Sequence, residues 1–229
     1  MSPPSHAPRD YQIAELTHGI QLPLPSLQRR HIMVIAEFLA SAWTGLLTTR
    51  KKVLLSEDEP EINALMEARL DIIRFERPEW SMLMAGVSRG KESVSFDGRS
   101  LEKRPDLSIH LTKRPFRFPL VVECKLIDAG SRKGVAMYCD NGIARFLEGE
   151  YAWYAQEAFM LAYVRDGATI ASCLTPHLEK NQEEVPDPYL TEQLPQAFTH
   201  VSQDLARSRH GRRFPTSPGS IEVWHLWLT

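Results

Sequence analysis

The sequence has few of the residues that cross-link small or secreted proteins. It holds three cysteines among 229 residues, at positions 124, 139 and 173, and no C-x-x-C spacing. An odd number of scattered cysteines argues against a disulfide framework or a cysteine-rich zinc site and favours reduced thiols in a cytoplasmic protein. Residues 1–10 hold three prolines and no apolar run, so we expect no secretory signal.

The chain also lacks an excess of charge of one sign. Lys and Arg number 27 and Asp and Glu number 29, which gives a formal net charge of −2. This balance excludes a uniformly basic surface for nucleic acid but is compatible with a basic groove on one side. With 12 Gly and 16 Pro, the composition excludes collagen-like and low-complexity chains. The length indicates one domain, with or without an appended helical segment.

An uninterrupted apolar run long enough to cross a membrane is missing. The best candidate is segment 31–49, which contains Glu37 and Gly45. A charge in the middle of a membrane span costs about 2.5–3.5 kcal/mol. We therefore expect a helix buried in the protein or docked on a partner, and no membrane association. The motifs G-x-x-x-x-G-K-[ST], H-E-x-x-H and G-x-S-x-G are also missing, so ATP-driven work would need a partner subunit.

The spacing of apolar residues predicts a mixed α/β fold. A helix over 27–47 follows Ser26, and a second helix begins in the acidic segment 56–61, where a proline and several acids suit a helix N-terminus. The expected strands are 80–87, 106–111, 120–127, 158–164 and 221–228; the expected further helices are 141–156, 168–180 and 196–207, with a loop over 181–195.

The strand expected at 120–127 carries two charges inside an apolar run. Because Glu123 and Lys125 are two residues apart, both project from the same face of the strand. An unpaired buried ion is very costly, so such charges need partners or a function. One interpretation is a surface ion pair worth about 0–1 kcal/mol. The other is a carboxylate and an ammonium held side by side for chemistry.

Asp106 favours the chemical interpretation. It begins the preceding expected strand, directly after Pro105, and can approach Glu123 if the two strands pair. Two adjacent carboxylates repel each other unless a cation lies between them, and a divalent metal with oxygen ligands fits that arrangement. Lys125 would then lie beside the metal, where an ammonium can orient a water or stabilise developing negative charge.

These residues resemble a known motif. Arg104-Pro105-Asp106, followed seventeen residues later by Glu123-Cys124-Lys125, is similar to the PD-(D/E)XK motif of restriction-endonuclease-like nucleases. The resemblance implies a mixed four- to five-stranded sheet flanked by helices, with a nuclease-like domain over 56–229 and an N-terminal irregular segment and helical extension over 1–55. It also implies hydrolysis of phosphodiester bonds, most often in DNA.

The resemblance further implies the roles of individual residues. Asp106, Glu123 and the backbone carbonyl of Cys124 would bind Mg²⁺, with Mn²⁺ as a substitute, and Lys125 would assist catalysis. Many members of this superfamily add a glutamate from the first core helix, and Glu61 is our candidate. Three other glutamates of the same region compete with it, namely Glu57, Glu59 and Glu67.

Two basic clusters are candidates for phosphate binding, because Lys and Arg gain affinity by releasing counterions from nucleic acid. Six Lys or Arg lie between Arg99 and Arg117, against two acids. A second cluster provides our expected nucleic-acid-binding residues, Arg207, Arg209, His210 and Arg212. A solvated loop is the ordinary alternative for each cluster.

A looser resemblance extends over segments 138–152, 208–212 and 221–228. It is to uncharacterised bacterial proteins of the same superfamily that are associated with defence against phage. The Q-x-x-x-Y element of the exonuclease branch is absent, since Gln156 is followed four positions later by Met160.

Together, these features predict a cytoplasmic Mg²⁺-dependent endodeoxyribonuclease that acts in anti-phage defence. Its partners would be DNA and a second copy of the chain or another subunit, an ATPase in trans among them. The alternative is a non-catalytic nucleic-acid-binding or scaffolding subunit. The choices between DNA and RNA and between single and double strands stay open.

Overall fold

Seven strands form one mixed sheet in the computed structural model, which describes residues 10–90, 93, 95–96, 104–215 and 217–229. The strand order is β1 (Met84–Ser88), β2 (Leu107–Leu111), β3 (Leu120–Ile127), β4 (Glu157–Val164), β7 (Ile221–Leu228), β6 (Asp204–His210) and β5 (Thr191–Ala197). The pairs β3–β4 and β4–β7 are parallel, and all other neighbours are antiparallel. The predicted α/β class is therefore confirmed, but the expected four to five strands are too few.

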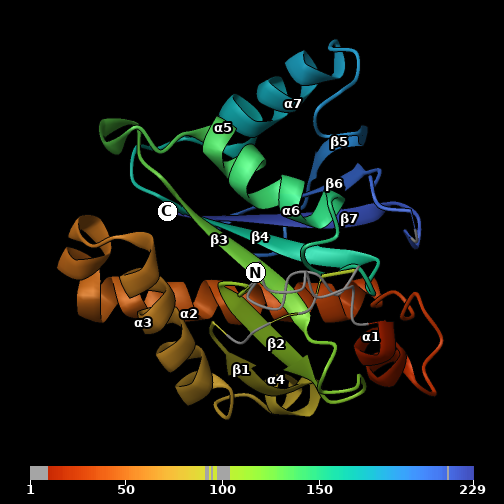
Figure 1. Cartoon of the computed structure of the whole chain (residues 1–229). Helices are drawn as coiled ribbons and strands as arrows, with labels where there is room; N and C mark the ends of the chain where they lie inside the picture. The colour runs from red at the N-terminus through yellow and green to blue at the C-terminus, as the bar shows by residue number, and fades with distance from the viewer. Residues whose placement is uncertain (1–9, 91–92, 94, 97–103, 216) are drawn as a thin grey trace, which may run out of the picture.

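Helices cover both faces of this sheet (Figure 1). On one side lie α2 (Arg29–Ser56) and α3 (Glu59–Ile73), and α4 (Pro78–Leu83) leads into β1. On the other side lie α5 (Val135–Tyr138), α6 (Ala144–Leu147) and α7 (Thr175–Gln182), while α1 (Asp10–Thr17) lies near the end of β2. Short 3₁₀ or π segments complete the chain: η1 (Ala129–Ser131), η2 (Cys139–Ile143) and η3 (Ile170–Leu174).

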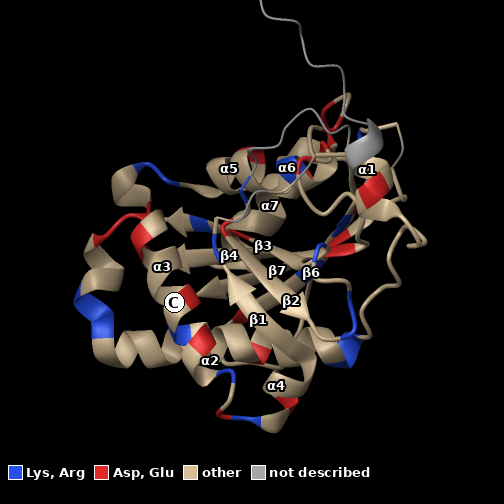
Figure 2. Ribbon diagram, turned by 60° about the horizontal axis from the view of Figure 1, so that its bottom comes forward, with Lys and Arg blue, Asp and Glu red and all other residues tan. Residues whose placement is uncertain are grey.

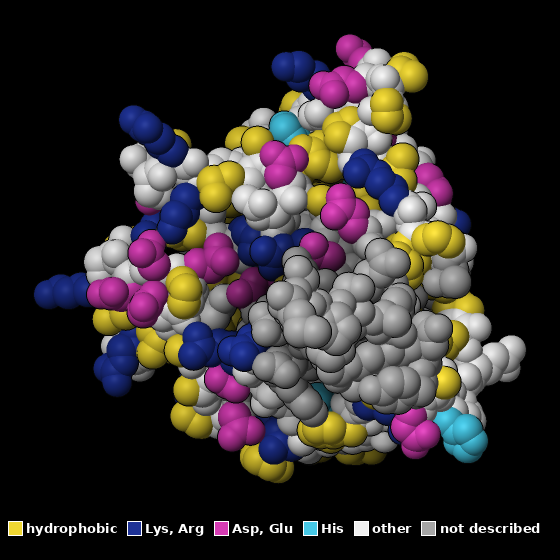
Figure 3. Space-filling view, viewed as in Figure 1, with side chains coloured by type: hydrophobic (Ala, Val, Ile, Leu, Met, Phe, Trp, Pro, Cys, Tyr) yellow, Lys and Arg dark blue, Asp and Glu magenta, His cyan; other side chains and the backbone are white. Residues whose placement is uncertain are grey.

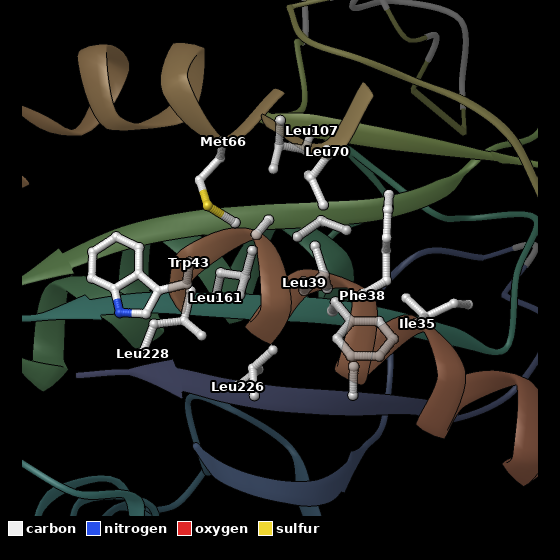
Figure 4. Packing of buried hydrophobic residues seen from close by; sticks show 14 of the residues in the cluster. Ile35, Phe38, Leu39, Trp43, Met66, Leu70, Leu107, Leu161, Leu226 and Leu228 are labelled. Carbon is white, nitrogen blue, oxygen red and sulfur yellow. The ribbon is translucent and has the colours of Figure 1, made fainter. Parts of the chain in front are cut away.

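Helix α2 is a layer of the core. Its buried side chains, such as Phe38, Leu39 and Trp43, belong to one hydrophobic cluster with Leu161 and Leu226 of the central strands (Figure 4). The predicted helix over 27–47 is therefore present and extends to Ser56. The apolar face of residues 29–56 covers the sheet.

The same helix is long and apolar enough to cross a membrane by length and composition alone. It is the one such helix among the residues that the structure describes, and 56% of its most apolar 18-residue stretch is buried inside the protein. A helix in a protein core can be as long and as apolar as a membrane span, and the packing of α2 against the sheet accounts for its apolar residues.

Several expected elements differ from the structure. The loop expected over 181–195 ends in a strand, because β5 begins at Thr191. The strand expected at 80–87 begins as α4, because Pro78 lies in a first helical turn, where its missing N–H costs nothing. The helix expected at 196–207 is replaced by the end of β5 and the start of β6, and β6 pairs with both β5 and β7. The helix expected at 141–156 ends at Leu147, where Gly149 adopts a φ of 72° that favours glycine.

The pairing of β2 with β3 stops early. It covers Leu107 to Ile109 against Val122 to Leu120, whereas β3 continues to Ile127 beside β4. The last half of β3 thus has an edge that is not covered by a neighbouring strand on the β2 side. Buried backbone groups at such an edge need other hydrogen-bond partners.

The packing of α2 gives a first prediction. Leu39→Ala removes a fully buried side chain of the core cluster and should lower the free energy of unfolding by about 2–5 kcal/mol. Leu55→Ala, on the same helix but 54% exposed, is the matched control and should change it by less than about 0.5 kcal/mol. Urea unfolding followed by circular dichroism measures both. Equal effects would contradict the assignment of α2 to the core.

Candidate active site

Carboxylates take the place of a neighbouring strand along the uncovered edge of β3. The backbone N–H of Cys124 donates to Oδ2 of Asp106 at 2.9 Å, and the N–H of Leu126 donates to Oε2 of Glu59 at 2.9 Å. Asp106 precedes β2, and Glu59 begins α3. Hydrogen bonds from the backbone to ionised carboxylates are stronger than those between neutral groups, so this edge fixes both acids in position.

Lys125 lies among three carboxylates. Its Nζ is 2.9 Å from Oε1 of Glu123, 3.4 Å from Oε1 of Glu59 and 3.5 Å from Oδ2 of Asp106. The ammonium also donates to the carbonyl of Cys124 at 2.7 Å. Asp106, Glu123 and Lys125 are therefore brought together, as the alternation along β3 and the pairing of two neighbouring strands predict.

A second cation reaches the cluster from the other layer. Arg145 of α6 donates through Nη1 to Oε1 of Glu123 at 2.8 Å and to the hydroxyl of Tyr151 at 3.2 Å. The π segment η2 directly precedes α6, and its Gly142 lies so close to β4 that a Cβ there would be 2.3 Å from Cε of Met160. This close approach brings the guanidinium to the sheet. Single π turns often occur at functional sites.

Helix α3 holds Asp106 from the opposite side. Nδ2 of Asn63 donates to Oδ1 of Asp106 at 3.0 Å, and the hydroxyl of Tyr163 donates to Oδ1 of Asn63 at 2.8 Å. Asn63 is 2% exposed. Since both ends of its amide have a partner, the side chain of Asp106 is held in one orientation.

The cluster contains more negative than positive charge when it is fully ionised. Three carboxylates, Glu59, Asp106 and Glu123, contact two cations, Lys125 and Arg145. Figure 2 shows most of the sheet without charge, with acidic and basic positions adjoining where β3 lies. One further positive charge, whether a proton or a metal ion, would balance the cluster.

Burial decides which group resists ionisation. Glu123 is fully buried, and its burial together with the charge of Asp106 raises the pKa of its carboxyl to about 8, despite Lys125 and Arg145. Burial also raises the pKa of Glu59. Burial opposes the charge of Lys125, but the three carboxylates raise its pKa overall. Oε2 of Glu123 is buried without a hydrogen-bond partner, so this oxygen is available to a further cation.

A cavity of about 470 Å³ gives access to this cluster. Its walls include Glu59, Glu61, Lys125, Lys133, Asn141 and Arg145. On the face in Figure 3, basic and acidic side chains adjoin near the middle of the molecule, beside atoms that the structure does not describe. Asp106 and Glu123 do not line the cavity themselves, but both contact Lys125, which does.

Glu61, our candidate for the helix glutamate, does not contact the cluster. It is exposed and lines the cavity, whereas Glu59 contacts Lys125 and the edge of β3. Two residues along a helix correspond to a rotation of about 200°, so only one of these glutamates can face β3. Glu59 was among the competing candidates, and the rotation of α3 selects it.

The predicted nucleic-acid-binding residues lie elsewhere in the sheet. Arg207, Arg209 and His210 belong to β6, which is separated from β3 by β7 and β4. Arg207 pairs with Glu222 and Arg209 with Glu192.

His210 is fully buried, and its ring bonds only inside the protein, to Ser208 and to the carbonyl of Tyr189. Strand alternation on β6 turns this side chain inward, so a phosphate cannot reach it and the expectation for His210 is corrected. Arg212 follows β6 and is half-buried, and its guanidinium donates to the backbone carbonyls of Ala152, Trp153 and Ala155.

The first basic cluster lies partly outside the described residues, which exclude 97–103. Of the rest, Arg114 pairs with Glu157, and Arg117 donates to the backbone carbonyl of Leu16 at 2.6 Å. These two arginines therefore hold the N-terminal segment against the sheet.

Sequence reasoning missed Asn63 and Arg145. Asn63 offers a weak signal, since it is a polar residue within the apolar spacing of a predicted helix. Arg145 offers none, because its approach depends on the π segment and on the close contact at Gly142.

Among the described residues, no group of three or more His, Cys, Asp and Glu side chains is arranged to hold a metal ion. The ammonium of Lys125 lies among the three carboxylates instead. No protein-family model matches the chain, and no curated protein or solved structure is significantly similar to it.

The raised pKa of Glu123 gives a second prediction, for the protein without divalent ions. Folded Glu123 keeps its proton up to about pH 8, while the unfolded chain releases it near pH 4.5, so unfolding releases a proton between these values. The free energy of unfolding should therefore fall as pH rises from about 5 to 8, by up to about 1.4 kcal/mol per pH unit. Asp106, Lys125, Arg145 and Tyr151 are the charged and titratable groups that face this carboxyl.

Urea unfolding at several pH values measures this slope. Glu123→Gln should flatten it, because the amide does not titrate, whereas the exposed Glu61→Gln should keep the wild-type slope. A slope that is unchanged in Glu123→Gln would show that other groups cause it.

Proposed function

We propose that the protein is a metal-dependent nuclease with a restriction-endonuclease-like core, which hydrolyses phosphodiester bonds in DNA. One observation carries the proposal. Asp106, directly before β2, and Glu123, on the neighbouring β3, meet at Lys125 beside a cavity. The motif resemblance supplies the reaction class, and this convergence supports it, because a motif that occurred by chance would not need to bring the three side chains together.

The order of elements also supports a core of this kind. Helix α3 is followed, after the short α4, by β1, β2 and β3, then by α5 and α6, then by β4. The resemblance implies this order of helix, three strands, helix and strand. On this view β7, β6 and β5 are additions that extend the sheet beyond β4.

The oxygen atoms of the cluster are of the type that a hard divalent ion binds. Asp106, Glu123 and the carbonyl of Cys124 would hold Mg²⁺ or Mn²⁺, with Glu59 as a further carboxylate; such ions prefer oxygen ligands. The excess negative charge and the unpartnered Oε2 of Glu123 support this fit. A bound ion of this type lowers the pKa of water and neutralises charge on a phosphate.

The side chains around the metal site would position the water, the phosphate and the metal ligands. Lys125 would orient the attacking water or stabilise negative charge that develops on the phosphate. Arg145, whose side chain is 36% exposed, presents a planar guanidinium that suits a phosphate. Asn63 would keep Asp106 in position.

The basic groups around the cavity become the candidates for phosphate binding. Lys133 and Arg145 line it with Lys125, and they replace the β6 arginines as our candidates for contacts with the DNA backbone. A cytoplasmic location, a role in anti-phage defence, and a second copy or an ATPase subunit as partner stay predictions from the sequence.

A second candidate function is non-catalytic binding of nucleic acid. The position of Lys125 favours it, because an ammonium that lies among the carboxylates can take the place of a metal ion. Such a protein would bind DNA with equal affinity in Mg²⁺ and in a chelator, and would never cut it.

The nuclease proposal makes a third prediction. Purified protein should nick supercoiled plasmid in Mg²⁺, and Lys125→Ala and Asp106→Asn should each lower the rate at least about 100-fold, as expected when one charge-stabilising group is lost. The matched control is Lys180→Ala, an exposed lysine on α7, which should cut like wild type. Equal nicking by wild type and Lys125→Ala would overturn the assigned chemistry.

A fourth prediction separates the two helix glutamates. Glu59→Gln should lower the nicking rate about 10- to 100-fold, because Glu59 contacts Lys125 and the edge of β3. Glu61→Gln should retain most of the activity, since its side chain is exposed. Gel assays over a range of Mg²⁺ concentrations measure both variants. The reverse ranking would show that α3 is rotated differently in the active protein.

A further inference from the structure

A second cavity, of about 260 Å³, lies beside the carboxylate cluster. Most of the side chains that line it carry a planar ring. The lining residues that matter here are Ser108, His110, Phe116, Phe118, Trp153 and Tyr154. This volume is just below the usual range for small-molecule pockets, about 300–1,000 Å³, so it suits one ring system and excludes a folded peptide.

The two strands that build the candidate active site also build this cavity. Ser108 of β2 lies two residues after Asp106, which directly precedes that strand, and Val121 lies two residues before Glu123 on β3; both Ser108 and Val121 line the cavity. Side chains two apart on a strand share a face and are about 7 Å apart. Pro105, next to Asp106, also lines the cavity. Cavity and carboxylates are thus neighbours on one face of the sheet.

The aromatic walls present both ring faces and ring edges. The rings of Phe118 and Tyr154 are 4.6 Å apart, and Trp153 meets Phe118 edge-on at 6.1 Å. On the other side, His110 and Phe116 are stacked with centroids 3.8 Å apart. Phe116 is nevertheless 61% exposed. An exposed ring of this kind at the rim can close over a planar ligand without a cost in core packing.

Polar groups in the cavity are few. Ser108 is 3% exposed, and its hydroxyl has no hydrogen-bond partner within the described part of the chain. The guanidinium of Arg117 lies 5.6 Å from the ring of Phe118, and no acidic partner for it occurs among the residues described. The lining therefore combines π faces with a few polar groups, among them the hydroxyls of Ser93 and Ser108, the imidazole of His110 and the guanidinium of Arg117.

We propose that this cavity receives one unpaired base of the nucleic acid, next to the phosphodiester that is cut at Asp106 and Glu123. The inference rests on the proposed nuclease function and narrows the substrate to single strands or to a base rotated out of a duplex. Stacking on aromatic side chains is tolerant of sequence and typically contributes severalfold to more than a hundredfold in affinity per base. A base that is paired and stacked in a duplex cannot enter a cavity of this size, because its neighbours in the helix block it.

The test measures binding of a labelled trinucleotide and of the same trinucleotide without bases, by fluorescence anisotropy in EDTA. Both ligands carry the same phosphates, so the ratio of their affinities reports the bases alone, and a trinucleotide is too short to bind in many registers. Wild type should bind the complete trinucleotide at least about tenfold more tightly.

Two variants alter the cavity. Ser108→Leu fills it, and Phe116→Ala removes the exposed ring; each should lower the ratio of affinities toward one. Phe75→Ala is the matched control, because Phe75 is an exposed ring, 69% accessible, beside Arg74 on another part of the surface. It should keep the wild-type ratio. If Ser108→Leu fails to fold, as judged by its unfolding midpoint, Phe116→Ala decides the question.

The outcome is separate from that of the nuclease proposal. A ratio near one in wild type, or a ratio that Phe116→Ala leaves unchanged, overturns the base-binding site even if plasmid is cut through Lys125. A base-dependent ratio that the cavity variants abolish supports the site even if no cleavage is found. Lys125→Ala should weaken both ligands equally, because it contacts phosphate and not base.

Discussion

The uncovered edge of β3 is the feature on which the candidate site depends. Where β2 stops pairing, the N–H groups of Cys124 and Leu126 would lack partners, and the carboxylates of Asp106 and Glu59 accept them. These two acids then lie within reach of Lys125, which also pairs with buried Glu123. The hydrogen bonds from the backbone N–H groups and the ion pairs with Lys125 therefore hold the same carboxylates in position and reinforce each other.

The rest of the fold keeps this edge both rigid and accessible. Helices α2 and α3 pack on one face through a continuous apolar cluster, and α3 brings Glu59 and Asn63 to the edge. The π segment before α6 brings Arg145 from the other face. The cost is concentrated at Glu123, a buried carboxyl with one unpartnered oxygen. Buried groups of this kind are expected where a protein trades stability for function.

Much of the local structure could be predicted, because short-range patterns decide it. Strands 120–127 and 221–228 were expected with the bounds that β3 and β7 have, and the acidic start of α3 was expected from its proline and acids. The predictions fail where contacts with distant segments of the chain determine the secondary structure. Segment 196–207 has weak helical spacing, yet it forms strands because the edge of β7 is available for pairing.

The sequence by itself determined that Glu123 and Lys125 share a face and that Asp106 precedes the adjacent strand, since alternation along a strand is a property of the backbone. The tertiary structure alone decided that Glu59 and not Glu61 completes the cluster. It also decided that Arg145 joins it and that His210 is buried inside the sheet. The physical reason is the same in each case: the rotation of a helix and the covering of a strand depend on packing between segments far apart in the chain.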